Sequence, residues 1–470
     1  MAFSGSNINI IEQCKISPPP ASVSSPTSIP LTIFDIFMSI FPPVQRLLFY
    51  DLHHSKPYFL ETVLPNIKHS LSLTLQHFFP LAGNITWPQA SSLPEIQYIN
   101  GDYVLLTVAE SGSDNDFSSL VGNHAKSANG LHTLAPKLLM KVSTANNKCL
   151  PIMAIQVTVF PNQGICIGIT YSHSAADGKT LNHFIKSWAS RCKLQGRSSN
   201  DDDGSILSIP SYDRSLLVTN TDLNMSCLNY LKRYNITRDT FYLSKDNHYD
   251  YEDKVLATFV MRPHTIKRLR QWVLSRVSDK KSHLSAFVLT TAYVWVCLSK
   301  AQSSERVAEE GYIEYFGFLV DFRLKVDPPL PVTYFGNCLI PVLVESKRID
   351  LVGEDGVLIA AELIGNAIQK MEDGDGILEN IGNFLLTEFT FIPDQTLTVA
   401  GSTKFGIYQT DFGWGTPKKS EVISISGTGA ISLTECSTEA GGVEIGLVRK
   451  TREVEAFTSL FANTIERFVL

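Results

Sequence analysis

The segment ICIGITYSHSAADGKTLNHFIKSW, residues 165–188, changes its hydrophobic period halfway along its length. Up to Tyr171, isoleucines alternate with small or polar residues, which is the pattern of a strand with one buried face. After Gly178 the apolar residues recur at helical spacing, at Leu181, Phe184, Ile185 and Trp188. His173 shares the parity of the isoleucines. We therefore expect a strand from Ile165 to His173, with His173 on its buried face where strand gives way to helix.

His173 carries the chemistry of this segment. An imidazole accepts and returns protons near neutral pH without a large change in its pKa. The small residues Ser174, Ala175 and Ala176 leave space beside the ring, and strand ends commonly present catalytic groups. We interpret His173 as a general base that faces a channel. The alternative is a core histidine that is satisfied by a backbone partner.

Asp177 follows His173 by four residues and has two interpretations. Its carboxylate either accepts the second imidazole N–H, as in a catalytic triad, or faces away and holds the turn. The sequence leaves both open. A metal site would need at least a third ligand, and no His-rich or Cys-rich motif supplies one, so we predict no metal.

Composition limits the functional classes. The chain has 470 residues, of which 44% are hydrophobic and 18% charged. This length is greater than one ordinary hydrophobic core supports, so we predict two domains. A net charge of -6 argues against binding to nucleic acid or to an anionic membrane. No apolar run approaches the roughly 20 residues that span a bilayer, and residues 1–7 lack signal-peptide features. We expect a cytoplasmic monomer that acts on small molecules, with its eight scattered cysteines reduced.

The order of the expected elements suggests where the domains divide. Two apolar runs, 152–160 and 165–173, are joined by Pro161-Asn162-Gln163-Gly164, which predicts a hairpin. A polar stretch at 195–213, with an acidic run at 201–203, cannot bury enough apolar surface to fold alone. We assign residues 1–195 to an N-terminal domain, 196–225 to a crossover and 226–470 to a C-terminal domain. In the last we expect strands at 254–261, 317–322, 337–344, 421–425 and 442–448, a buried helix at 284–298 and a closing helix at 454–468.

Two further motifs stand out. Asp411-Phe412-Gly413-Trp414-Gly415 by itself suggests a tight turn that is braced by aromatic packing. Tyr334-Phe335-Gly336-Asn337-Cys338 follows a proline-rich loop and by itself suggests the start of a strand.

Taken together, these motifs resemble those of a known family. His173 through Asp177 is similar to the His-x-x-x-Asp motif of the plant BAHD acyltransferases, and residues 411–415 match that family's second signature. Residues 334–338 resemble a motif of its anthocyanin and flavonoid glycoside acyltransferase branch. The stretches at 30–35, 79–83 and 399–402 also resemble that branch, so the resemblance covers nearly the whole chain.

The resemblance implies a fold and a mechanism. It implies a mixed α/β fold of two domains, each similar to chloramphenicol acetyltransferase, with a channel between them. It implies acyl transfer from a coenzyme A thioester to a hydroxyl, with His173 as the base and no acyl-enzyme, and the sequence has no Gly-x-Ser-x-Gly elbow. Asp177 is expected to pair with an arginine, for which Arg323 is the candidate. Asp411 is expected near the channel in a mainly structural role.

The acyl-CoA cosubstrate needs cations or helix N-termini for its phosphates, and we expect no permanently bound cofactor. Lys267 lies in the densest basic region of the second half, with Arg268, Arg270, Lys280 and Lys281. Our candidates for contacts with coenzyme A are Lys267, Ser285 as the cap of the following helix, Ser402 and Lys404. The alternative for each cation is a solvated helix face.

The identity of the acyl donor rests on one residue. The branch contains malonyltransferases and hydroxycinnamoyltransferases that act on sugar hydroxyls of phenolic glycosides. A buried malonyl carboxylate requires a positive partner, and Lys179 at the start of the helix is our candidate. This favours malonyl-CoA as donor and a phenolic, flavonoid or anthocyanin glucoside as acceptor. The alternative for Lys179 is a solvent-facing lysine on the first helical turn. The alternatives are a hydroxycinnamoyltransferase, a thioester hydrolase and a non-catalytic ligand-binding protein.

Overall fold

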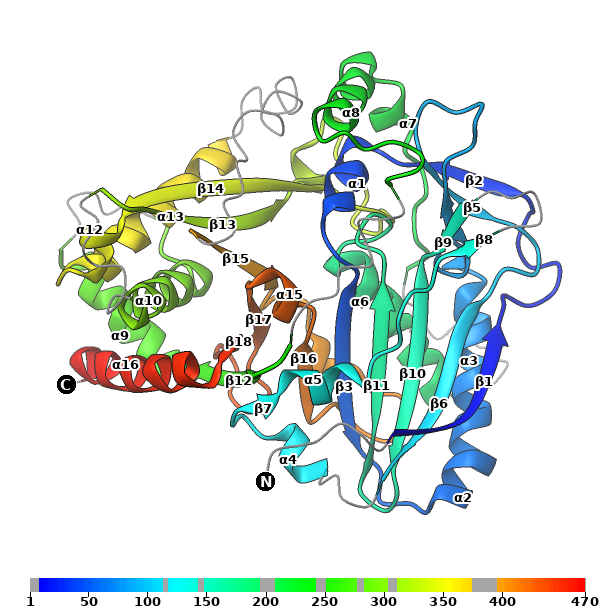
Figure 1. The fold of residues 1–470 in the computed structure, drawn as a ribbon, viewed down its shortest axis with the longest axis horizontal. Coiled ribbons are helices and arrows are strands. Elements are labelled where there is room, and N and C mark those ends of the chain that lie inside the picture. Colours follow the sequence, from blue (N-terminus) through cyan, green and yellow to red (C-terminus); the bar gives the residue numbers. More distant parts are fainter. Residues whose placement is uncertain are drawn as a thin grey trace.

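The computed structural model describes residues 8–112, 117–142, 148–194, 208–241, 251–276, 283–302, 311–373 and 395–469. The described chain forms two large mixed sheets and one smaller sheet, with helices packed on them (Figure 1). The first large sheet lies in the right half of Figure 1 and the second in the left half. This is the mixed α/β fold that the sequence predicts.

The first sheet has the strand order β1-β6-β10-β11-β3-β16. Its strands are β1 (Ile8–Ile16), β3 (Val44–Asp51), β6 (Val104–Ser111), β10 (Met153–Phe160), β11 (Gly164–Tyr171) and β16 (Lys419–Val422). Helices α3 (Leu64–Leu75) and α6 (Gly178–Lys193) pack against each other beside it, where the indole N–H of Trp188 donates to Ser70 Oγ at 3.2 Å. The buried face of this sheet and these helices belong to one hydrophobic cluster that continues into the second half of the chain.

The predicted hairpin is confirmed. β10 and β11 pair antiparallel in a register that sets Met153 opposite Tyr171 and Phe160 opposite Gly164. β11 is flanked by β10 and β3, so it lies inside the sheet, and all of its residues are buried. The strand ends at Tyr171, earlier than predicted, and His173 lies in the turn that leads to α6.

The second sheet has the order β14-β13-β15-β17-β18-β12-β7. Its strands are β7 (Lys126–Ser127), β12 (Lys254–Met261), β13 (Ile313–Asp321), β14 (Leu339–Lys347), β15 (Thr396–Gly401), β17 (Ile431–Glu435) and β18 (Val443–Lys450). Its helices include α9 (Pro263–Leu274), α10 (Ala286–Ala301), α13 (Gly356–Asp373) and α16 (Thr451–Val469). The predicted strand at 421–425 is wrong in its second half, because β16 ends at Val422 and the short helix α15 (Ile425–Thr428) follows.

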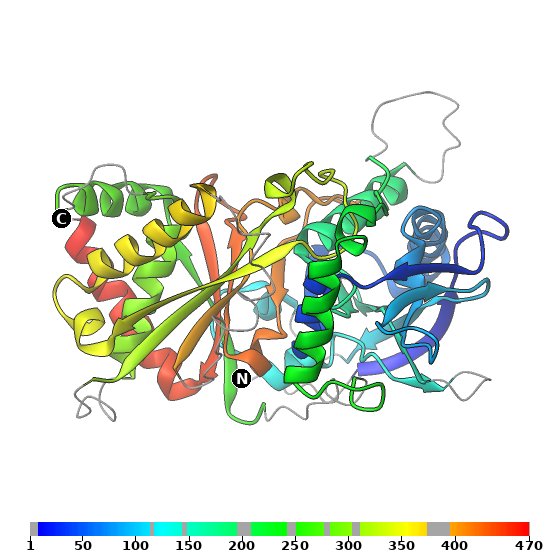
Figure 2. The same cartoon turned by 90° about the horizontal axis from the view of Figure 1, so that it is seen from above.

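The smaller sheet has the order β2-β5-β4-β9-β8, with β2 (Thr27–Pro30), β4 (Asn84–Thr86), β5 (Glu95–Tyr98), β8 (Lys141–Val142) and β9 (Lys148–Pro151). Two helices from distant parts of the sequence lie beside each other, α1 (Ile33–Phe37) and α8 (Thr221–Arg233). In Figure 2, α8 (green) stands between the two halves of the molecule. The other short helices are α2 (Lys56–Tyr58), α4 (Phe117–Val121), α5 (Ala128–His132), α7 (Ser215–Val218) and α12 (Arg348–Val352), together with η1 (Met38–Ile40), η2 (Phe59–Val63), η3 (Phe79–Ala82), η5 (Arg323–Lys325) and η6 (Ile407–Gln409).

Two strands cross the predicted boundary between the halves. β16, from the C-terminal half, pairs antiparallel with β3 of the first sheet. β7, from the N-terminal half, pairs antiparallel with β12 of the second sheet. The predicted crossover at 196–225 contains α7 and the start of α8, whereas the acidic run at 201–203 lies outside the described residues. Each large sheet therefore includes a strand from the other half of the chain.

Two further expectations concern cysteines and membranes. All eight cysteines are free thiols, as the absence of paired spacing predicts. Among the residues that the structure describes, no helix is both long and apolar enough to cross a bilayer.

Candidate active site

The turn that carries His173 is fixed on both sides. The backbone N–H of Ser172 donates to the carbonyl of Ile152 at 2.8 Å, and that of Ala175 donates to the carbonyl of Ser172 at 3.1 Å. His173 is half-buried, and its ring lies 6.2 Å from that of Phe41. Burial lowers the pKa of the imidazole, although hydrogen bonding and the nearby carboxylates of Asp177 and Asp35 act in the opposite direction. The neutral ring, which is the form that accepts a proton, is thereby favoured near pH 7.

Asp177 holds the turn and does not contact the imidazole through a hydrogen bond. Its Oδ1 accepts from the backbone N–H of Thr180 at 2.9 Å, so it caps α6. Its Oδ2 accepts from Nη2 of Arg323 at 2.7 Å, and both side chains are buried. Within the described residues, Nδ1 of His173 has no hydrogen-bond partner. The predicted pairing with Arg323 is confirmed. Asp177 fixes the turn and is not a triad partner of the imidazole in this structure.

Arg323 joins this turn to the second half of the chain. Its guanidinium donates to the carbonyl of Gly336 at 2.9 Å and to Oδ1 of Asp321 at 2.9 Å, in addition to Asp177. Burial alone would lower the pKa of Arg323, but the charges of Asp177 and Asp321 outweigh it and raise that pKa. Arg323 is therefore a permanent cation that ties α6 to the loop before β14.

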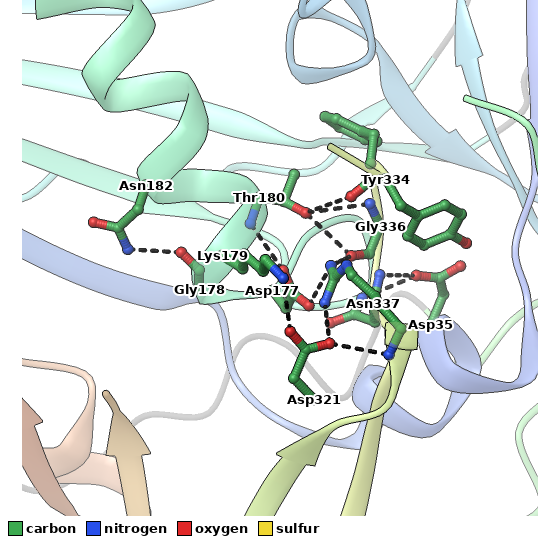
Figure 3. Close-up of polar contacts among 12 residues, drawn as sticks. Asp35, Asp177, Gly178, Lys179, Thr180, Asn182, Asp321, Tyr334, Gly336 and Asn337 are labelled. Atoms are coloured by element: carbon green, nitrogen blue, oxygen red, sulfur yellow. Dashed lines mark hydrogen bonds and ion pairs between the residues drawn. The ribbon is translucent and has the colours of Figure 1, made fainter. Parts of the chain in front are cut away.

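Lys179 belongs to the same network. Its Nζ donates to Oδ2 of Asp321 (Figure 3). The two atoms are 2.9 Å apart, and the two side chains are 37% and 39% exposed. The sequence hypothesis assigned the positive charge of Lys179 to a malonyl carboxylate. In the structure, a carboxylate of the protein already neutralises this ammonium group, so the structure gives that assignment no support.

A second clamp reaches His173 from Asn337. The side-chain Nδ2 of Asn337 donates to the carbonyl of His173 at 2.8 Å and to Oδ1 of Asp35 at 2.9 Å. Oδ2 of Asp35 accepts from Nη1 of Arg214 at 2.7 Å. The stretches at 30–35, 173–177 and 334–338, noted separately in the sequence, thus meet in one buried network.

Sequence reasoning missed the roles of Asp35, Asn337 and Arg214. One signal was available for Asp35, since it is a carboxylate within the apolar segment Ile33–Phe37 and a buried charge requires partners. Nothing in the sequence indicates which residues those partners are, because Asn337 is 302 positions away.

Asp411 lies at the opposite end of α6 from Asp177. It forms an ion pair of 2.8 Å with Lys193, the last residue of the helix, and accepts from the backbone N–H groups of Gly413 at 2.8 Å and Gly415 at 3.0 Å. Burial raises the pKa of this carboxyl, but these donors outweigh it and lower that pKa. A helix of 16 residues is about 24 Å long, so the structure does not bring Asp411 to His173.

The turn that follows Asp411 is braced by aromatic rings, as the sequence suggests. Phe412 is buried, and its ring lies 4.9 Å from that of Trp188 and 5.7 Å from that of Tyr50. The glycine at 413 has φ of 109°, which few other residues adopt, and a Cβ there would lie 3.3 Å from the backbone of Lys193. These contacts favour a structural role for the motif.

The candidate contacts to coenzyme A lie in two places. Lys267 is exposed on α9, and Ser285 caps α10 by accepting from the N–H of Val288 at 3.3 Å, as predicted. Arg270, also on α9, donates to the carbonyl of Leu284 at 2.9 Å and so connects α9 to the start of α10. Lys280 and Lys281 lie outside the described residues.

Ser402 and Lys404 lie in the loop after β15. Ser402 Oγ accepts from the N–H of Lys404 at 3.2 Å, and Lys404 is exposed. The next residue, Phe405, covers the first residue of α6, since a Cβ on Gly178 would lie 2.8 Å from its ring. The structure thus brings the loop of Ser402 and Lys404 to the helix start that Asp177 caps. The interaction of these residues with coenzyme A stays a prediction.

The overall fold is that of known two-domain acyltransferases. The crystal structure of vinorine synthase aligns with a TM-score of 0.67 and 20% identity, over 96% of this chain and 98% of that chain. The structure of F. sporotrichioides TRI101 complexed with coenzyme A and T-2 aligns with a TM-score of 0.63 and 15% identity, over 91% of this chain and 96% of that chain.

The model of the Transferase family matches residues 7–464, so the chain belongs to this family, the BAHD acyltransferases. It is therefore an acyl-CoA acyltransferase. The anthocyanin 3-O-glucoside-6''-O-malonyltransferase of Dahlia pinnata is 38% identical, over 98% of each chain. The phenolic glucoside malonyltransferase 1 of Nicotiana tabacum is 39% identical, over 90% of this chain and 91% of the relative. An Arabidopsis thaliana coumaroyl-CoA:anthocyanidin 3-O-glucoside-6''-O-coumaroyltransferase is 36% identical, over 98% of each chain.

Proposed function

We propose that this enzyme transfers a malonyl group from malonyl-CoA to a sugar hydroxyl of a phenolic, flavonoid or anthocyanin glucoside, with His173 as general base. It acts as a cytoplasmic monomer with no permanently bound cofactor, and its two substrates meet at His173 in a channel between the halves. Two relatives of 38% and 39% identity that are named as malonyltransferases of glucosides support the donor and the acceptor.

The reaction proceeds in one complex without an acyl-enzyme. The imidazole of His173 takes the proton from the acceptor hydroxyl as that oxygen attacks the thioester carbonyl. The C–S bond then breaks, and the proton passes from the imidazole to the departing sulfur of coenzyme A. A general base accelerates a reaction by about 10²- to 10⁴-fold, so the positioning of both substrates supplies much of the remaining rate acceleration.

The single observation that carries this proposal is that the turn of His173 is held rigidly while its imidazole is kept neutral. Two buried clamps, Arg323 with Asp177 and Asn337 with the His173 carbonyl, fix the turn from the second half of the chain. Burial lowers the pKa of His173, which favours the basic form of the ring. A fixed and neutral imidazole suits a general base.

The second candidate function is hydroxycinnamoyl transfer to the same class of acceptor. It is favoured by the coumaroyltransferase relative, whose identity of 36% is nearly that of the malonyltransferases. Lys179, which the sequence hypothesis pairs with an anionic donor, forms an ion pair with Asp321 in this structure.

The experiment is a matrix of donors against acceptors. Purified enzyme is given malonyl-, acetyl- or coumaroyl-CoA with anthocyanin, flavonoid or simple phenolic glucosides, and products are identified by mass. We expect malonylated glucoside from malonyl-CoA, and none with the variant His173→Ala. Coumaroyl transfer alone would establish the second candidate, release of coenzyme A without an acceptor would indicate a hydrolase, and binding without turnover would indicate a ligand-binding protein. Full activity of His173→Ala would refute the base assignment.

A further inference from the structure

The amide of Asn337 has only one orientation that its surroundings allow. Its two N–H groups donate to Oδ1 of Asp35 at 2.9 Å and to the carbonyl of His173 at 2.8 Å. If the amide were turned over, its oxygen would face a carboxylate and a carbonyl, which are both acceptors. The side chain is fully buried, so water cannot compensate.

Asp35 is itself held at both oxygens. Oδ2 accepts from the backbone N–H and the hydroxyl of Thr32, each at 2.9 Å, and from Arg214 at 2.7 Å. Oδ1 accepts from the backbone N–H of Asn337 at 3.0 Å as well as from its side chain. The carboxylate is fully buried and cannot move without losing charged hydrogen bonds. It therefore serves as a rigid support for Asn337.

The buried polar atoms without a hydrogen-bond partner in the described part of the chain include one on each of the two residues that this clamp joins. One is Nδ1 of His173 and the other is Oδ1 of Asn337. A protonated Nδ1 is a donor and an amide oxygen is an acceptor, so the two complement each other.

We propose that Asn337, supported by Asp35, is a positioning residue that fixes both the turn and the ring tautomer of His173. Its N–H groups hold the His173 carbonyl, and its Oδ1 provides the acceptor for a proton on Nδ1. The basic lone pair is then on Nε2, and this nitrogen takes the proton of the acceptor hydroxyl. This inference rests on the proposed function, since it requires His173 to be the base.

The groups around the imidazole agree with this assignment. Apart from burial, the influences on its pKa all raise it, and they come from its own carbonyl, from the Asn337 side chain, and from the carboxylates of Asp177 at the start of α6 and Asp35 on α1. The cation of Arg323 faces Asp177, and that of Arg214 faces Asp35. A carbonyl and an amide oxygen are both acceptors, which favours a protonated Nδ1.

The test compares Asn337→Ala with the matched control Tyr334→Phe. The hydroxyl of Tyr334 is buried and has no hydrogen-bond partner in the described part of the chain, so its removal breaks no hydrogen bond. We expect Asn337→Ala to lower kcat by about 10²-fold, the typical cost of a displacement of about 1 Å, with KM for the acyl donor unchanged. The acidic limb of its pH–rate profile should move to lower pH, because a contact that raises the pKa of His173 is lost. Tyr334→Phe should match the wild type.

Each outcome has a distinct meaning. Wild-type turnover of Asn337→Ala, or a loss of kcat with an unmoved acidic limb, would overturn the positioning role. If Asn337→Ala does not fold, nitrogen-15 spectra of wild-type enzyme with labelled histidine decide the matter, with the His173 signal assigned from His173→Ala. A proton on Nδ1 in the neutral ring supports the inference, and a proton on Nε2 overturns it. Activity of His173→Ala would instead refute the proposed function.

Discussion

Arg323 and Asp177 form an ion pair of 2.7 Å in which neither side chain reaches solvent. A buried pair gives little net stability relative to apolar residues, but the loss of one partner leaves an unpaired buried charge. We expect Arg323→Ala to lower the free energy of unfolding by about 3–5 kcal/mol, measured as a fall in the midpoint of urea unfolding.

The matched control is Lys179→Ala, in the neighbouring exposed pair with Asp321. Exposed pairs contribute about 0–1 kcal/mol. If Arg323→Ala and Lys179→Ala lowered the free energy of unfolding equally, burial of the Arg323 pair would not be the cause of its effect.

The donor preference should not depend on Lys179. Because Asp321 already neutralises its ammonium group, we expect Lys179→Ala to change KM for malonyl-CoA and for coumaroyl-CoA by the same factor. Steady-state kinetics with both donors measure this. A loss confined to malonyl-CoA would show that the ion pair opens to receive the donor, as the sequence hypothesis supposes.

Asp411 should affect stability more than chemistry. Asp411→Ala removes the acceptor for two backbone N–H groups, and charged hydrogen bonds of this kind contribute about 1.5–3 kcal/mol. We expect a lower melting temperature and a turnover that greatly exceeds that of His173→Ala. Lys193→Ala is the control, because this side chain is 59% exposed and should contribute about 1 kcal/mol at most. A dead Asp411→Ala enzyme with wild-type stability would place Asp411 in the chemistry.

The buried carboxylate of Glu444 should make stability depend on pH. Burial raises its pKa, but Lys419, Ser437 and Tyr408 outweigh this and lower the pKa below its ordinary value of 4.5. The folded state therefore binds fewer protons than the unfolded state at this pH, so the contribution is complete above 4.5 and is lost as the pH falls further.

We expect the melting temperature of the wild type to decrease as the pH is lowered beyond 4.5. In Glu444→Gln this decrease should be smaller, and the free energy of unfolding at neutral pH should be lower. Scanning calorimetry over a pH series measures both. Glu455→Gln, at an exposed position of α16, should follow the wild type. An unchanged slope in Glu444→Gln would show that other carboxylates dominate.

The sequence predicts what depends on neighbours in the chain. The period change at 165–188 indicates a strand and a helix, and Asp177 is the residue that caps the helix. The pairing of Asp177 with Arg323 is predicted only by the resemblance to a family and by no local pattern. The contacts of Asn337 with Asp35 and His173 depend on tertiary structure, and no local pattern encodes a partner 302 positions away.

β16 shows the same limit. Lys419 and Glu421 would be expected on a surface, yet both are buried, because Glu444 and Lys126 neutralise them where the two large sheets meet. The partner strand of β16 is β3, far away in the sequence, and the strand has only four residues to signal its pairing.

The pairing of β16 with β3 also affects how the protein is made. A ribosome completes β3, β10 and β11 early, but residues 419–422, which cover the outer edge of β3, emerge only when nearly the whole chain has been translated. Until then the growing polypeptide exposes unpaired backbone groups along β3, which are a template for association with other chains. Nascent and prematurely terminated chains of this enzyme therefore carry an open sheet edge at Arg46–Phe49, which closes when β16 pairs with β3.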